Sequence, residues 1–282
     1  PWGACSSLGG FPIVGLVGRP CGRALRGGGG GLAAGIALAL AARAPGLRVR
    51  TAEPAGFDDM ARETQAMQRD DTANPGMLWV LEGEALWSRK TGAAARACAD
   101  CHGEAASMRG VAARYPAHDA VSGRPVDLAG RIALCQERHQ GREPAPRESQ
   151  ESLALAAFVA HQSRGLPIAP PADPRLAEAR ALGERLWRER RGQLDLACAQ
   201  CHDDNAGQRL AGSVIPQGHP TGYPLYRLEW QTLGSLQRRL RGCMVGIRSE
   251  PHPYGAEEYI ALELYLMERA AGLPIETPAV RP

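Results

Sequence analysis

Two stretches, Cys98-Ala-Asp-Cys-His102 and Cys198-Ala-Gln-Cys-His202, share the pattern C-x-x-C-H. This pattern is typical of covalent attachment of c-type haem. The two thiols can each form a thioether to a haem vinyl group, and the adjacent histidine then reaches the iron. C-x-x-C alone also occurs in zinc sites and redox pairs, but a trailing histidine in both copies favours haem. We therefore predict two covalently bound haem c groups, attached through Cys98, Cys101, Cys198 and Cys201, with His102 and His202 as proximal ligands.

Length and charge narrow the class of protein further. The chain has 282 residues, which is enough for two haem domains of about 100 residues each. Aromatic residues make up only 5% of the chain. Covalently bound haem would add a large apolar group to each core, so few aromatic side chains are needed. The net charge of +3 is too close to neutral to indicate binding to nucleic acid.

The N-terminal region has the features of an export signal. Arginines precede a short apolar run from Leu32 to Ala42, and Ala42-Arg-Ala44 offers a small-x-small cleavage site. The run is too short to span a bilayer. We therefore expect residues 1–46 to be a cleaved signal peptide with an upstream extension. The mature protein should have no membrane span and should lie in the periplasm.

The two C-x-x-C-H stretches belong to a longer internal duplication. Gly83-Glu-Ala-Leu-Trp87 precedes the first stretch, and Gly183-Glu-Arg-Leu-Trp187 precedes the second at the same spacing. Each copy continues with a segment that ends in cysteine and then with a helix that ends in Gly-Leu-Pro-Ile. These later elements are Leu128–Cys135, 152–162 and Gly165–Ile168 in one copy, and Leu236–Cys243, 256–271 and Gly272–Ile275 in the other.

The duplication predicts an all-α fold of two cytochrome c-like haem domains with long irregular loops. We expect an N-terminal domain over residues 47–168 and a C-terminal domain over residues 177–282. A proline-rich linker, residues 169–176, joins them.

Each haem iron needs a distal ligand or an open position. Outside the haem motifs and the N-terminal region the only cysteines are Cys135 and Cys243, at matching positions of the duplication. We therefore predict thiolate as the distal ligand of both irons. A disulfide between these two cysteines is an alternative. Other candidate ligands are Met108, His118 and His139 for the first iron, and Met244 and His219 for the second.

Arginines cluster around the second of these cysteines, at positions 238, 239, 241 and 248. Some could neutralise haem propionates, and others could form a site for a tetrahedral oxyanion, which suits the planar guanidinium. Arg239 lies one helical turn before Cys243, so both side chains can face the same pocket. We predict Arg239 and Cys243 as catalytic, and Arg241 and Arg248 as further substrate-binding residues.

Two segments of this chain resemble the SoxA family, whose members are dihaem subunits of the SoxAX cytochrome of thiosulfate oxidation. Arg239-Leu-Arg-Gly-Cys-Met-Val-Gly-Ile-Arg248 resembles the C-terminal domain of that family. Leu128-Ala-Gly-Arg-Ile-Ala-Leu-Cys135-Gln-Glu-Arg-His-Gln140 resembles the N-terminal one. The resemblance covers about residues 50 to 276, and its most specific part is the segment from Arg239 to Arg248.

The resemblance implies an activity, an L-cysteine S-thiosulfotransferase that couples thiosulfate oxidatively to a cysteine of the SoxYZ carrier protein. Electrons would pass through haem to an electron-accepting cytochrome c. It also implies a heterodimer with a SoxX-type monohaem cytochrome c. By position, Cys243 matches the distal ligand that carries a persulfide in the family, and Arg239 matches its active-site arginine.

Two other functions are compatible with two haem motifs. A dihaem electron-transfer protein needs no arginine cluster at Cys243. A dihaem peroxidase needs an iron with an open position, which two thiolate ligands would not leave.

Overall fold

Helices are the main regular structure in the part of the chain that the computed structural model describes, residues 56–282. The signal peptide expected over residues 1–46 lies outside the described residues. The α-helices in chain order are α1 (Arg62–Arg69), α2 (Met77–Ser88), α3 (Ala99–His102), α4 (Leu128–Cys135), α5 (Gln150–His161), α6 (Ala177–Arg188), α7 (Cys198–His202), α8 (Leu236–Gly246) and α9 (Glu257–Arg269). Shorter helical turns are η1 (Ala105–Met108), η2 (Ala112–Arg114), η3 (Gln136–Gln140) and η4 (Pro174–Leu176). Among residues 56–282, no helix has the length and apolar character needed to cross a bilayer.

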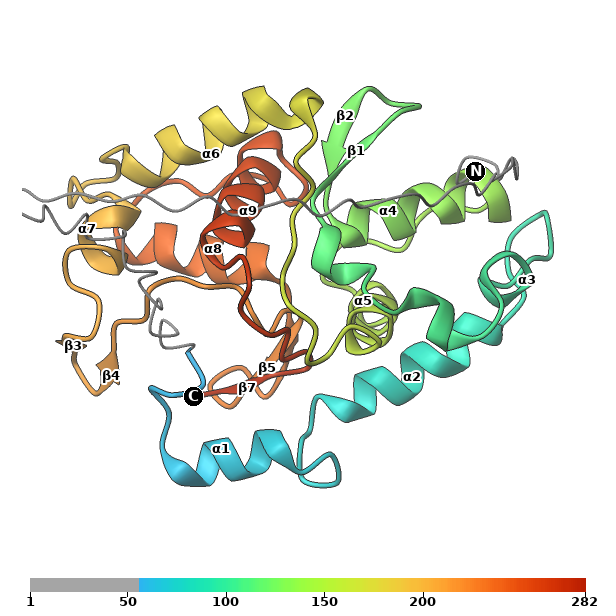
Figure 1. The fold of residues 1–282 in the computed structure, drawn as a ribbon, viewed down its shortest axis with the longest axis horizontal. Coiled ribbons are helices and arrows are strands. Elements are labelled where there is room, and N and C mark those ends of the chain that lie inside the picture. Colours follow the sequence, from blue (N-terminus) through green and yellow to red (C-terminus); the bar gives the residue numbers. More distant parts are fainter. Residues whose placement is uncertain (1–55) are drawn as a thin grey trace, which may run out of the picture. The chain divides into compact units, whose positions relative to one another are not determined.

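The duplication is visible as two packed pairs of helices, α2 with α5 and α6 with α9 (Figure 1). Glycine permits the close crossing in both pairs. A Cβ atom on Gly83 would lie 2.2 Å from the Ala154 carbonyl oxygen, and one on Gly183 would lie 2.2 Å from that of Ala261. The helices predicted over 152–162 and 256–271 are confirmed within two residues at each end.

The long loops predicted between each haem motif and its second cysteine contain short strands, so the expectation of an all-α fold is only partly confirmed. The strands are β1 (Ala117–Asp119), β2 (Arg124–Val126), β3 (Arg209–Leu210), β4 (Ser213–Val214), β5 (Leu225–Arg227), β6 (Thr232–Gly234) and β7 (Val280–Arg281). The pairs β1–β2 and β5–β6 are antiparallel hairpins at equivalent places in the two repeats. The prolines and glycines of these segments are typical of loops, so the sequence alone did not indicate strands. Pro125 is compatible with β2 because that strand has only one neighbour.

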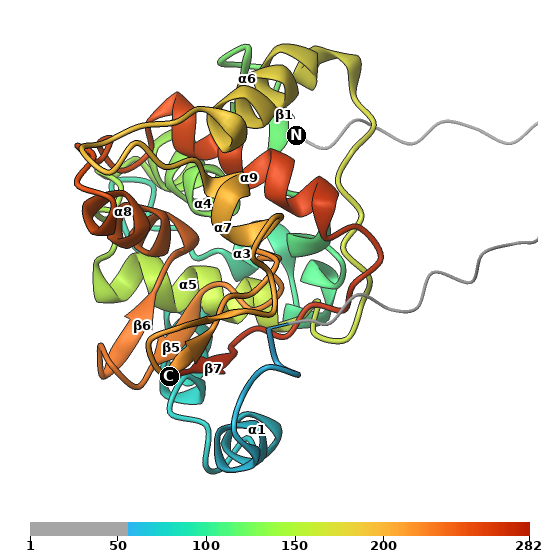
Figure 2. The same ribbon diagram turned by 90° about the vertical axis from the view of Figure 1, so that its left-hand side faces the viewer.

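The last strand ties the C-terminal segment to the beginning of the described chain. Strand β7 pairs in parallel with β5 and also contacts α1 (Figure 2). The backbone N–H of Val280 donates to Gln68 Oε1 at 3.0 Å, and Asn74 Nδ2 donates to the Pro278 carbonyl at 2.8 Å. Helix α1 and the C-terminal residues therefore hold each other in place, next to the second repeat's hairpin.

The two Gly-Leu-Pro-Ile segments contact one another. Gly165 N–H donates to the Ile275 carbonyl at 2.8 Å, and Gly272 N–H donates to the Ile168 carbonyl at 2.9 Å. An antiparallel bridge pairs Pro167 with Pro274. Equivalent residues of the two repeats thus face each other, and residues 56–282 all lie within one compact unit.

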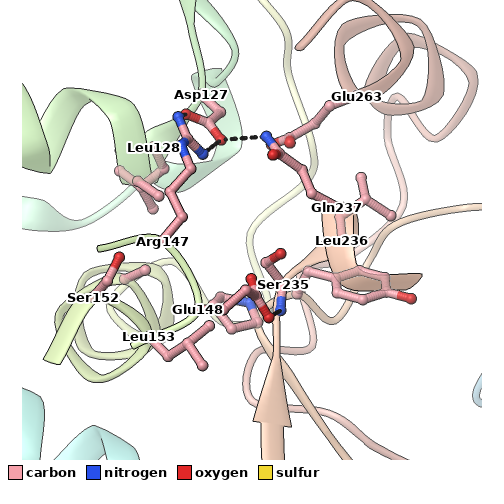
Figure 3. Close-up of a pocket in the computed structure, with 14 residues that line it drawn as sticks. Asp127, Leu128, Arg147, Glu148, Ser152, Leu153, Ser235, Leu236, Gln237 and Glu263 are labelled. Atoms are coloured by element: carbon pink, nitrogen blue, oxygen red, sulfur yellow. Dashed lines mark hydrogen bonds and ion pairs between the residues drawn. The ribbon is translucent and has the colours of Figure 1, made fainter. Parts of the chain in front are cut away.

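A polar cluster joins the N-termini of α4 and α8, the two helices that carry the paired cysteines (Figure 3). Asp127 caps α4 and accepts two hydrogen bonds from the Arg147 guanidinium, at 2.6 and 2.8 Å. Buried Gln237 of α8 donates to Asp127 Oδ2 at 3.0 Å. Glu263 of α9 lines the same cavity, which has a volume of about 80 Å³. Burial, followed by the charge of Asp127, raises the pKa of Glu263 to about 8, although Arg147 opposes this shift.

Replacing Glu263 with glutamine should make the protein less sensitive to pH. The folded state retains the Glu263 proton up to about pH 8, whereas the unfolded chain loses it near pH 4.5. The wild type therefore loses stability as the pH rises from 4.5 to 8. Glu263→Gln mimics the protonated form, so it should unfold like the wild type at pH 4.5 and be about 1–3 kcal/mol more stable at pH 8. Denaturant unfolding at both pH values measures this, with exposed Glu250→Gln as the control. An equal effect of Glu263→Gln at both pH values would contradict the prediction.

Candidate catalytic site

Helix α7 consists of the second C-x-x-C-H motif, and the surrounding residues fix its histidine. The Ala197 N–H donates to Gln200 Oε1 at 2.8 Å, which satisfies a free backbone donor at the start of the helix. The His202 ring packs against the Trp187 ring of α6 at 5.6 Å. His202 Nδ1 lies 2.6 Å from the Pro216 carbonyl oxygen. Because that carbonyl can only accept, Nδ1 carries the proton, and Nε2 is left to bind a metal.

The first motif has the same arrangement. The rings of Trp87 and His102 are 5.7 Å apart, and the Ala97 N–H donates to Asp100 Oδ2 at 2.9 Å. Trp87 Nε1 donates to the Gly103 carbonyl at 3.0 Å, just beyond α3. In both repeats, the tryptophan that lies eleven residues before the first cysteine of the motif therefore packs against the motif's histidine.

Helix α8 brings the predicted catalytic pair to one cavity. The Ser235 hydroxyl caps its N-terminus by accepting from the Arg238 N–H at 3.2 Å. Arg239 and Cys243 lie one turn apart, and both line a cavity of about 570 Å³ together with His202. This volume falls within the range of about 300–1,000 Å³ that is usual for ligand and cofactor sites. His202 and Cys243 line this cavity, and Cys198 and Cys201 lie in the same short helix as His202, so the residues at and beside the cavity fit covalently attached haem c.

Electrostatics distinguish Cys243 from its counterpart in the first repeat. Burial raises the pKa of the Cys243 thiol, but the hydrogen bond with His202 and the charge of Arg239 outweigh it, so the pKa lies below its usual value. Burial also raises the pKa of Cys135, and there the charge of Arg131 is not sufficient to offset it. Cys243 therefore has the greater tendency to be a thiolate. Both cysteines are free in the structure, so no disulfide links them.

The arginines that line the cavity are only partly those that the sequence predicts. Arg241 donates to the His252 carbonyl and stacks over the Tyr254 ring at 4.6 Å. Arg248 is exposed, in a left-handed conformation beyond the end of α8. Neither lines the cavity that contains Cys243, whereas Arg227 of β5 and Arg281 of β7 do. The expectation that Arg241 and Arg248 bind substrate in this cavity is therefore not supported, because both side chains lie elsewhere.

Of the two alternative ligands for the second iron, Met244 and His219, only His219 lines the cavity. Met244 is buried, and its sulfur accepts a hydrogen bond from the Tyr259 hydroxyl at 3.4 Å, so it belongs to the core. His219 lines the cavity, on the loop after β4. In the first repeat, Met108 packs against the core, and His118 lies in β1.

Two C-x-x-C-H helices, each with a supported histidine and a cysteine-bearing helix in the same repeat, define a c-type cytochrome. Comparison with known proteins narrows this class. The family model described as "SoxA/TsdA, cytochrome c domain" matches residues 82–168 and 182–275. Its two segments coincide with the two repeats. The chain belongs to the SoxA family.

Individual relatives agree with this assignment. The chain is 38% identical over 221 residues to the L-cysteine S-thiosulfotransferase subunit SoxA of Pseudaminobacter salicylatoxidans, covering 78% of this chain and 77% of that protein. It is 32% identical to the subunit of the same name from Paracoccus pantotrophus, covering 79% and 76%. The crystal structure of SoxXA from P. pantotrophus superposes with a TM-score of 0.79 at 31% identity, covering 82% of this chain and 87% of that chain.

Proposed function

We propose that this chain is the SoxA subunit of an L-cysteine S-thiosulfotransferase, which couples thiosulfate oxidatively to a cysteine of the SoxYZ carrier protein. The observation that carries the proposal is the cavity in which Cys243, Arg239 and His202 face one another. The relatives that cover more than three quarters of the chain are named for this activity.

The residues of the cavity have separate roles in this proposal. Arg239 binds the sulfonate end of thiosulfate through charge-assisted hydrogen bonds. Cys243, held as a thiolate, forms a bond to the outer sulfur of thiosulfate as two electrons leave, which gives a Cys243 S-thiosulfonate. The carrier thiol then attacks that outer sulfur, takes the thiosulfonate, and releases Cys243 as a thiolate and one proton. Cys198, Cys201, His202 and Cys243 would hold haem c, which would supply one-electron chemistry at this site.

The overall reaction balances as a two-electron coupling. Thiosulfate, with charge −2, and a carrier thiol give a carrier cysteine S-thiosulfonate, with charge −1, two electrons and one proton. The new bond joins the outer sulfur of thiosulfate to the carrier sulfur, and the bond that breaks is the thiol S–H. The electrons pass to a SoxX-type partner cytochrome and on to an electron-accepting cytochrome c.

The first repeat completes a dihaem protein in this proposal. Cys98, Cys101, His102 and Cys135 would hold a second haem c. Residues 47–168 and 177–282 form the two haem domains, joined by residues 169–176, and only the C-terminal one is catalytic. The mature protein acts in the periplasm, where c-type haem and a cleaved export signal are both expected.

Thiosulfate turnover by the haem-loaded chain tests the proposal. The chain is combined with its monohaem partner and the carrier protein, and haem reduction is followed on addition of thiosulfate. Mass spectrometry of the carrier then detects the added thiosulfonate. We expect both signals in the wild type. Haem reduction by other donors, with no thiosulfate-dependent product on the carrier, would indicate a plain electron-transfer protein instead.

A further inference from the structure

The two repeats differ in charge at one position beside the catalytic cavity. The distance along the chain from the first hairpin to the second equals the distance from the first cysteine-bearing helix to the second. By this spacing, Asp119 of β1 is equivalent to Arg227 of β5, and Arg131 is equivalent to Arg239. At this position a carboxylate in one repeat is therefore replaced by a guanidinium in the other.

In the first repeat, the carboxylate neutralises the arginine that precedes the cysteine. Arg131 Nη1 lies 2.9 Å from Asp119 Oδ1, and the Asp119 side chain is only 3% exposed. Arg138 also contacts Asp119, at 2.8 Å. Hydrogen bonds from these arginines and from Ser122 hold the pKa of Asp119 far below its usual value. The charge of Arg131 is therefore already balanced by the Asp119 carboxylate.

In the second repeat, the corresponding arginine has no such partner. Among the residues that the structure describes, the Arg239 guanidinium is in no ion pair. Arg227 lies beside the same cavity and is only 15% exposed. Burial, followed by repulsion from Arg239, lowers the pKa of Arg227. Two guanidinium groups thus repel each other in a half-buried site, and an anion bound between them would relieve that repulsion.

Neighbouring groups fix Arg227 in position without cancelling its charge. Its Nε donates to the Pro282 carbonyl at 2.7 Å, and its guanidinium lies 5.2 Å from the centre of the Trp230 ring. Its one ion-pair partner among residues 56–282, Glu229, is 65% exposed and is therefore strongly screened by water. Arg227 is held ready for a ligand before that ligand arrives.

We infer that Arg227 and Arg239 together bind a doubly charged sulfur oxyanion, and that Arg227 is the residue that makes the second repeat an anion site where the first is not. This inference rests on the proposed function for the identity of the anion, thiosulfate. The pair of arginines also explains why the carrier S-thiosulfonate is released. Coupling to the carrier reduces the charge of the bound group from −2 to −1, so a site with two guanidinium groups holds the substrate more tightly than the product.

The test compares Arg227→Gln with the wild type, both as the full haem-loaded chain. Calorimetric titration measures the affinity for thiosulfate and for methanethiosulfonate, a monoanion that retains the outer sulfur. We expect Arg227→Gln to weaken thiosulfate binding by about tenfold or more, because a charge-assisted hydrogen bond is lost. Binding of methanethiosulfonate should change by less than about threefold. Arg227→Lys should restore part of the affinity, and exposed Arg124→Gln, on the hairpin of the first repeat, should leave it unchanged.

Haem propionates are the other anions that could occupy this pair of arginines. Haem content and the reduction potential of the second haem are therefore measured for each variant. An unchanged thiosulfate affinity would overturn the inference, and a shifted potential in that case would assign Arg227 to a propionate. If the wild type binds thiosulfate through Arg227 but never modifies the carrier, the inference stands and the proposed function fails.

Discussion

Cys243→Ala should reduce thiosulfate-dependent turnover by at least about 10³-fold while the protein retains its covalently attached haem. The magnitude is that seen when a nucleophile is removed from a site whose other parts remain. Haem attachment depends on Cys198 and Cys201 in α7, whereas Cys243 lies in α8 and faces the cavity beside Arg239. The substitution therefore removes the reacting sulfur and leaves the attachment chemistry in place.

Turnover is measured as haem reduction and as mass added to the carrier, with the monohaem partner present. Val245→Ala is a suitable control because Val245 lies on the same helix and is 61% exposed. Full activity in haem-loaded Cys243→Ala would exclude a bond between thiosulfate and Cys243. In that case the coupling would have to occur without this sulfur, and the proposed role of Cys243 would be wrong.

Gly183→Ala should destabilise the protein strongly, although alanine is the better helix former. In an open helix the change from glycine to alanine stabilises by about 0.5–1 kcal/mol. At this position the new Cβ would lie 2.2 Å from the Ala261 carbonyl oxygen and 2.8 Å from Tyr265 Cβ. Backbone cannot move aside as a flexible side chain can, so α6 and α9 must separate. We expect a loss of about 3 kcal/mol or more, at the upper end of the cost of overpacking a core.

Gly242→Ala provides the matched comparison, because no atom lies within 4 Å of its new Cβ and Gly242 is also within a helix. That variant should be as stable as the wild type or slightly more stable. Thermal unfolding of the haem-loaded proteins gives both values. Equal stability of Gly183→Ala and the wild type would show that the close helix crossing is not needed for the fold.

Much of this architecture could be predicted from the sequence, because the duplication repeats its signals. The spacing of tryptophan, C-x-x-C-H and a second cysteine recurs, and each recurrence supports the other. The hairpins could not be predicted in the same way. Strands of three residues have no measurable alternation, and Gly123 and Pro125 indicate a loop as readily as a turn between strands.

That Arg239 and Cys243 line one cavity could be predicted from helical geometry. Four residues complete about one turn, so Arg239 and Cys243 share a face. Arg241 is two residues from Arg239, about 200° around the helix, so the same geometry places it on another face. Arg227 also lines the cavity, but its position there could not be predicted because it lies on a separate hairpin. A position-by-position comparison of the repeats would have found it, since it is aspartate in the first.

The contact between the two Gly-Leu-Pro-Ile segments has the form of an interface between identical subunits. Residue 165 pairs with 275, and residue 272 pairs with 168, so each copy gives and receives the same bonds. Two-fold symmetric dimers are built in this way, with one patch serving both partners. These bonds join backbone groups, so side chains elsewhere in the two repeats, such as Asp119 and Arg227, can differ without altering the joint between the halves.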